Sequence, residues 1–90
     1  MREQEEQLWR TQLREFIEAN MNTVDDDVVL RDDDNIFANR YVNSLFSMRL
    51  LNFVEAISGI SVADEDIVLA NFRSIDAMLA LISKHRGAGQ

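Results

Sequence analysis

The chain has 90 residues, of which 47% are hydrophobic and 28% charged, with no cysteine, no proline and a formal net charge of −7. This length supports one small domain, and the lack of cysteine excludes disulfides, thiol catalysis and thiolate metal sites. No stretch approaches the roughly 18 apolar residues of a transmembrane helix, and the charged N-terminus shows no signal peptide. We therefore expect a cytoplasmic protein without membrane contact. Its acidity disfavours nucleic-acid binding and favours basic partner surfaces.

The composition favours helix, because the chain has three glycines, no proline and few alternating β-branched runs. We expect an all-α fold, a small bundle of four helices (three long, one short) with a long loop between the first and the second. The predicted domain covers residues 1–86 of a monomer and leaves residues 87–90 as a frayed tail.

Residues 3–20 predict the first helix, because apolar residues recur there every three or four positions. Three glutamates, Glu3, Glu5 and Glu6, fall in its first turn, where carboxylates favour the positive end of the helix dipole. The predicted apolar stripe consists of Leu8, Trp9, Leu13, Phe16 and Ile17.

Residues 21–42 lose the helical period and predict a loop of about 20 residues, a length that is often functional in a small domain. It contains two acidic triplets, 25–27 and 32–34, which either bind a divalent cation or remain a solvated, self-repelling segment. Their spacing does not match an EF-hand loop. The apolar residues expected to pin the loop onto the helices are Val28, Val29, Leu30, Ile36 and Phe37.

Residues 44–58 predict the second helix, which Asn43 or Ser44 can cap. Gly59 can end it in the left-handed conformation, followed by a hydrophobic contact of Ile60. The predicted core arc consists of Phe46, Leu50, Leu51, Phe53, Val54 and Ile57. The opposite face carries Leu45, Met48, Asn52 and Glu55.

Residues 64–70 predict a short third helix, and residues 75–83 predict the last, with Ser74 as its N-cap. The predicted stripe of the last helix is Ile75, Met78, Leu79 and Ile82. His85 is the single histidine, and its place near the C-terminal tail predicts a solvated side chain. No spacing suggests a base and nucleophile pair, so we do not expect an enzyme.

Ser44 is the candidate functional residue, because it lies where the long loop meets the second helix. A serine at this position usually acts as a cap. A helix N-terminus also stabilises a phosphate ester through free N–H groups and the dipole, so an exposed serine there can be modified. Both interpretations stay open on the residues alone.

The layout resembles the acyl carrier protein family, whose Asp-Ser-Leu motif corresponds to Asn43-Ser44-Leu45. The resemblance continues through residues 50–55, 59–62, 64–66 and 71–76. It implies that a phosphopantetheinyl transferase attaches 4′-phosphopantetheine from coenzyme A to Ser44, and that the arm carries an acyl group as a thioester. Asn43 departs from the motif, since it keeps a capping side chain but lacks the charge of the family's aspartate.

The resemblance also implies that the second helix docks partner enzymes. The candidate docking residues are Leu45, Met48, Arg49, Asn52 and Glu55. Arg49 could pair with a partner acid, with Asp34 or with Glu55, and Phe46 could pack inward or line the path of the acyl chain. The whole net charge falls in residues 1–34, so electrostatic steering is expected from the loop.

A narrower resemblance concerns Asn43-Ser44-Leu45-Phe46 and residues 71–75, which are similar to free-standing carriers in polyketide pathways. It implies a glyceryl or alkoxymalonyl-type cargo, an acyl-loading enzyme and downstream polyketide enzymes as partners. Two alternatives remain: an aminoacyl carrier of non-ribosomal peptide assembly, and an unmodified acidic helical domain that binds a basic partner.

Overall fold

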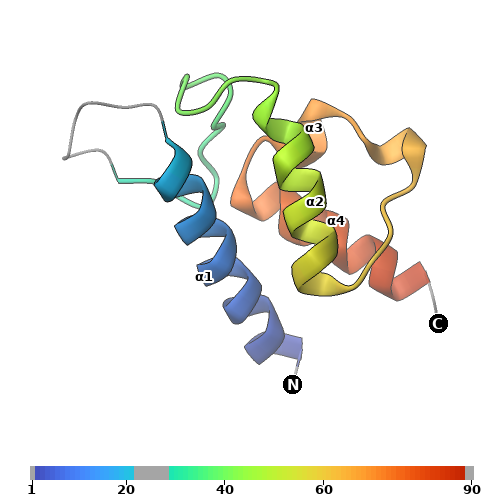
Figure 1. Cartoon of the computed structure of the whole chain (residues 1–90). Coiled ribbons are helices and arrows are strands. Elements are labelled where there is room, and N and C mark those ends of the chain that lie inside the picture. Colours follow the sequence, from blue (N-terminus) through green and yellow to red (C-terminus); the bar gives the residue numbers. More distant parts are fainter. Residues whose placement is uncertain (1, 22–28, 89–90) are drawn as a thin grey trace.

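The computed structural model describes residues 2–21 and 29–88, and over these ranges the chain is all-helical with no strand, as predicted (Figure 1). Three longer helices pack around one core, and the non-helical residues 29–45 lead to the start of α2 at the top of the view. The first residue of α1 and the last of α4 lie in its lower part. The elements are α1 (Arg2–Asn20), α2 (Phe46–Ser58), the 3-10 turn η1 (Asp64–Asp66), α3 (Leu69–Phe72) and α4 (Ile75–Ala88).

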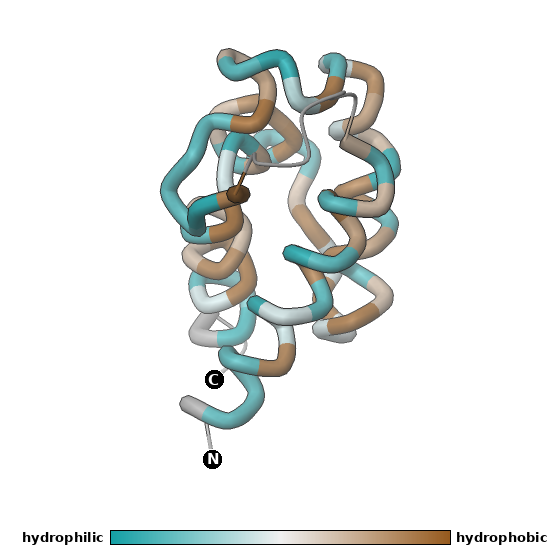
Figure 2. The backbone as a smooth tube through the Cα atoms, turned by 90° about the vertical axis from the view of Figure 1, so that its left-hand side faces the viewer, coloured by the Kyte–Doolittle hydropathy of each residue, from teal (hydrophilic) through white to brown (hydrophobic). Residues whose placement is uncertain are grey.

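Most of the core is built from the predicted apolar positions of α1, α2 and α4, and hydrophobic residues recur along the helices between hydrophilic ones (Figure 2). Leu81 is also buried, although the stripe predicted for the last helix did not include it. The prediction is wrong for Leu8, which was expected in the apolar stripe of α1 but has a side chain that is 57% exposed. The loop adds three buried residues, Leu30, Ile36 and Val42. The buried residues of the helices are Leu13 and Ile17, Phe46, Leu50 and Val54, Phe72, and Ile75, Met78, Leu79, Leu81 and Ile82.

Aromatic side chains fasten α1 to both ends of α2. The ring of Phe16 stacks on that of Phe53 at 4.2 Å between centroids and on that of Phe46 at 5.4 Å. At the other end the indole N–H of Trp9 donates a hydrogen bond to the carbonyl of Ile57 at 3.2 Å. A buried indole normally finds such an acceptor, so these contacts fix α1 and α2 along their length.

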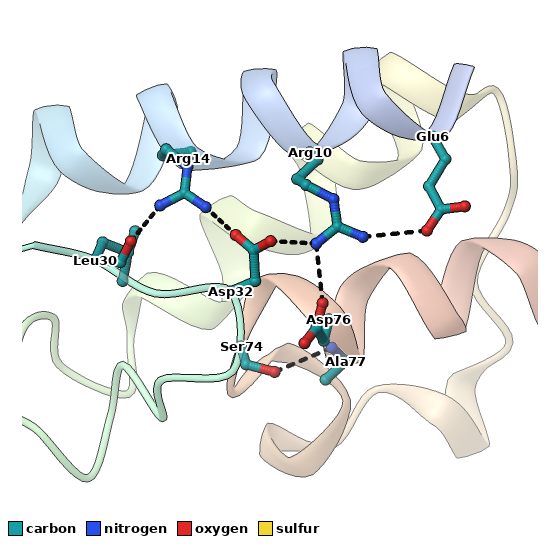
Figure 3. Close-up of polar contacts among 8 residues, drawn as sticks. All are labelled: Glu6, Arg10, Arg14, Leu30, Asp32, Ser74, Asp76 and Ala77. Carbon is teal, nitrogen blue, oxygen red and sulfur yellow. Dashed lines mark hydrogen bonds and ion pairs between the residues drawn. The ribbon is translucent and has the colours of Figure 1, made fainter. Parts of the chain in front are cut away.

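The loop is anchored to α1 by ion pairs of Asp32 (Figure 3). The Asp32 carboxylate accepts hydrogen bonds from Arg10 and Arg14, and Arg14 also donates to the carbonyl of Leu30. Arg10 extends the network to the carboxylate of Asp76, at 3.0 Å. These contacts join α1, the loop and α4 through one cluster of charges.

Backbone hydrogen bonds attach the same loop to the junction of α3 and α4. The N–H of Ile36 donates to the carbonyl of Arg73 at 2.8 Å, and the N–H of Asp76 donates to the carbonyl of Asp32 at 3.0 Å. The segment that leads to Ser44 is therefore held from two sides.

Two expectations for this loop are wrong. Val29 does not pin it, because its side chain is 74% exposed. The second acidic triplet is not merely solvated, since Asp32 is ion-paired and Asp34 accepts the N–H of Arg31 at 2.9 Å. Residues 25–28 lie outside the described residues. Within the described ranges no group of three or more acidic, histidine or cysteine side chains could hold a metal ion.

The predicted third helix is divided into two pieces. The 3-10 turn η1 and the four-residue helix α3 are separated by Ile67 and Val68, and Val68 is extended, with φ −133° and ψ 151°. Ile67 forms a tight turn in which the N–H of Val68 donates to the carbonyl of Asp66 at 2.9 Å. Two consecutive β-branched residues restrict the side-chain rotamers of a helix, which agrees with the break here.

The helix α4 is longer than predicted and runs to Ala88, so residues 87 and 88 are helical; residues 89–90 lie outside the described part. Its predicted cap is confirmed, because the N–H of Ala77 donates to the Ser74 hydroxyl at 3.0 Å. The end of α2 is also confirmed, since Gly59 has φ 73° and its N–H donates to the carbonyl of Glu55. None of the described helices has the length and apolarity to cross a membrane.

We predict that Asp32→Asn lowers the free energy of unfolding by about 1–2 kcal/mol, because two arginines lose charge-assisted hydrogen bonds in a partly buried position. Urea unfolding followed by circular dichroism measures the change. Asp33→Asn is the matched control, since Asp33 is exposed, and it should have almost no effect. Equal effects of the two substitutions would contradict the anchoring role of Asp32.

Candidate functional site

Ser44 and Leu45 form a turn directly before α2, and both side chains are exposed. The carbonyl of Ser44 accepts hydrogen bonds from the N–H and the hydroxyl of Ser47, at 3.1 and 2.7 Å. The hydroxyl of Ser44 itself makes no hydrogen bond with the part of the chain that the structure describes. It is thus a solvent-facing nucleophile on a well-fixed backbone.

The cap of α2 is Asn43 and not Ser44. The N–H of Phe46 donates to the side-chain oxygen of Asn43 at 3.2 Å, and α2 begins at Phe46, two residues later than predicted. The next two amides, of Ser47 and Met48, donate to the carbonyls of Ser44 and Leu45. These three N–H groups are therefore engaged, whereas the amides of Ser44 and Leu45 make no hydrogen bond within the described ranges, so free amides remain beside Ser44 at these two positions only.

An open hollow of about 650 Å³ lies beside Ser44. It is bounded by the end of α1, the loop and the start of α2. Two arginines from different elements reach it: Arg40 from the loop, with a left-handed φ of 61°, and Arg49 from α2. The residues that line it include Asn20, Arg40, Asn43, Ser44, Phe46 and Arg49.

Arg49 does not make either of the ion pairs expected within the domain. Its guanidinium donates to the side-chain oxygen of Asn20 at 3.0 Å. The same group lies 5.6 Å and 5.5 Å from the ring centroids of Phe16 and Phe46. Such cation–π contacts hold the guanidinium in place without neutralising its charge.

The predicted docking face is partly confirmed as a surface. Leu45 is 78% and Met48 56% exposed, and Asn52 is exposed too. Glu55 differs, because it is half-buried and accepts the N–H of Val62 at 2.9 Å, which ties the segment after α2 back to that helix. Phe46 packs inward, at 6% exposure, while it also borders the hollow.

His85 is not the solvated side chain that was predicted, since only 14% of it is exposed. Its Nδ1 lies 3.0 Å from the carbonyl of Leu81, and its Nε2 accepts the N–H of Ala63 at 3.2 Å. Asp66 lies 3.4 Å from Nε2 and pairs with Lys84 at 3.0 Å. His85 therefore fastens α4 to the segment that contains η1. In the sequence, the one sign of a packed histidine is its position one helical turn after Leu81.

No model of a known protein family matches this chain, and neither a curated protein nor a solved structure matches it. The resemblance to carrier proteins therefore depends on the chain's own residues and on their geometry.

We predict that Asn43→Ala lowers the free energy of unfolding by about 1 kcal/mol, the usual effect of losing a helix cap. Ser44→Ala should change it by less than about 0.5 kcal/mol, as expected for an exposed side chain without a hydrogen bond. Urea unfolding of the two variants side by side measures the difference. A loss in Ser44→Ala as large as that in Asn43→Ala would show that Ser44 is the cap.

Proposed function

We propose that this chain is a carrier protein, in which the Ser44 hydroxyl bears a 4′-phosphopantetheine arm taken from coenzyme A. The observation that carries the proposal is the exposed hydroxyl of Ser44, which has no structural hydrogen bond within the described ranges. A serine whose only role is to cap the helix would accept a hydrogen bond from a backbone N–H of the first turn. Here the side chain of Asn43 accepts that hydrogen bond instead. The all-helical fold and the Asn43-Ser44-Leu45 motif agree with the proposal.

In this function the chain is a substrate and then a tether, not an enzyme. Ser44 Oγ loses its proton to a base of the phosphopantetheinyl transferase and attacks the phosphorus that bears the pantetheine arm. The phosphoanhydride bond of coenzyme A breaks, and adenosine 3′,5′-bisphosphate leaves. The arm then holds the acyl group as a thioester, away from the domain. What the domain itself contributes is a rigid backbone around the serine and a surface that partner enzymes recognise.

The partner surface lies next to the serine. Leu45 and Met48 expose apolar area on the first turns of α2, and the flexible side chain of methionine adapts to partners of different shape. Helix α2 carries one arginine and one glutamate and is neutral, so the acidic segment before it supplies long-range steering. Within that segment Asp33 is exposed, whereas Asp32 is held by the arginines of α1.

For the cargo we propose a glyceryl or alkoxymalonyl-type unit used in polyketide biosynthesis in the cytoplasm. The support is the sequence resemblance over residues 43–46 and 71–75. An aminoacyl carrier would present the same serine and the same helix, because the loading enzyme selects the cargo. The mass of the intact protein from its native host separates the two.

We predict that coenzyme A and a broad-specificity phosphopantetheinyl transferase add the mass of one phosphopantetheine to the chain. Intact-protein mass spectrometry reads the result. Ser44→Ala should abolish the shift. Ser47→Ala, the matched control one turn further on, should keep it, because that hydroxyl serves the backbone. An unshifted wild-type chain, under conditions that modify a known carrier, would overturn the proposal.

We also predict that Met48→Ala weakens binding to the transferase mainly by speeding dissociation, since it removes apolar contact area and no charge. Surface plasmon resonance gives both rate constants. Leu8→Ala is the matched control, because Leu8 is similarly exposed but lies on α1. If Leu8→Ala and Met48→Ala have the same effect, the docking face lies elsewhere.

A further inference from the structure

We propose that Arg40 and Arg49 form an anion clamp that holds the phosphodiester group of the arm in the hollow beside Ser44. This inference rests on the proposed function and assigns to two residues a role that the sequence did not suggest. The phosphodiester is bonded directly to Ser44 Oγ, so it must lie at the hollow that Ser44 and both arginines line.

The charge of the hollow is opposite to that of the protein. The chain as a whole has a net charge of −7, yet the described residues that line the hollow include two arginines and no carboxylate. The described lining of the hollow beside Ser44 therefore carries a local surplus of positive charge. An anion of one negative charge, such as a phosphodiester, complements it.

Arg49 is prepared for such an anion. One of its five N–H donors bonds to Asn20, and the faces of Phe16 and Phe46 flank the group. Among the described residues no carboxylate lies within the 4 Å of an ion pair from Arg49, whereas Arg10, Arg14 and Arg86 each have at least one. Its remaining donors can therefore bind a phosphate oxygen without first breaking a salt bridge.

Arg40 is held at the same hollow by a strained turn. Its backbone φ of 61° is an angle that residues other than glycine and asparagine rarely adopt. Two hydrogen bonds close the turn, from the N–H of Arg40 to Phe37 at 3.1 Å and from the N–H of Tyr41 to Ile36 at 3.0 Å. Such strain persists only where the surrounding structure enforces it, and it is common at ligand sites.

Side chains supply the charge of the clamp, because few amides at the helix start are available: only those of Ser44 and Leu45 make no hydrogen bond within the described ranges. The amides of Phe46, Ser47 and Met48 are already hydrogen-bonded within the turn. A guanidinium can bind two oxygens of one phosphate at once, which suits this role better than an ammonium. A carboxylate on the cargo is a poorer candidate, since binding it here would require the long flexible arm to fold back and lose conformational entropy.

Titration of the unmodified chain with inorganic phosphate tests the clamp without the arm. We expect saturable changes in the NMR signals of the Ser44 amide and of the Nε–H groups of Arg40 and Arg49, at constant ionic strength. Arg40→Gln and Arg49→Gln should each weaken binding up to about fivefold, the range of an exposed ion pair. Arg31→Gln, an exposed arginine outside the hollow, is the matched control and should leave it unchanged. Changes that do not saturate, or that persist in the double variant, would overturn the clamp.

The modified chain gives the second test, through the phosphorus NMR signal of its phosphodiester. In the wild type this signal should be broader and shifted relative to the Arg40→Gln, Arg49→Gln double variant, in which the root of the arm is released. Identical signals would overturn the clamp while the carrier function stands. Failure of the wild type to gain the arm would count against the carrier function, and the phosphate titration then decides on the clamp alone.

Discussion

The pairing of Asp32 with Arg10 and Arg14 is the contact on which the position of the candidate site depends. The chain between α1 and α2 has no regular secondary structure over residues 29–45, so ordering it opposes folding by about 1–2 kcal/mol for each residue fixed. Burial of Leu30 and Ile36 on either side of Asp32 offsets part of that entropy. The geometry around Ser44 thus depends on an ion-pair cluster that joins α1, the loop and α4, so the site can be lost while the helices remain.

The parts of the fold that could be predicted are those set by neighbours in sequence. Helical periodicity located the core faces of α1, α2 and α4, and the caps at Ser74 and Gly59 follow from local chemistry. The break between η1 and α3 was missed because acidic residues at 64–66 look like a helix start, while the extended Val68 is decided by its packing context. Leu8 fits the period of the stripe but lies in the first half of α1, where it remains exposed.

Contacts between distant residues explain most of what the sequence missed at the site. Arg49 meets Asn20 across 29 positions, and Ala63 meets His85 across 22, and no periodic pattern marks such pairs. The serine itself was predictable because a polar residue where a loop meets a helix is a local signal. The sequence did not show which of the two residues caps the helix. In the structure Asn43 makes the capping hydrogen bond, and the Ser44 hydroxyl stays exposed.

The start of α1 and the end of α4 both lie away from Ser44 (Figure 1). The start of α1 and the end of α4 lie in the lower part of Figure 1, whereas α2 begins at the top, next to Ser44. A dye, a bead or a neighbouring domain joined at either end would therefore sit away from the serine. Under the proposed function, attachment at a chain end and docking near Ser44 use different parts of the molecule, so the serine stays accessible to several enzymes in turn while the protein is attached elsewhere.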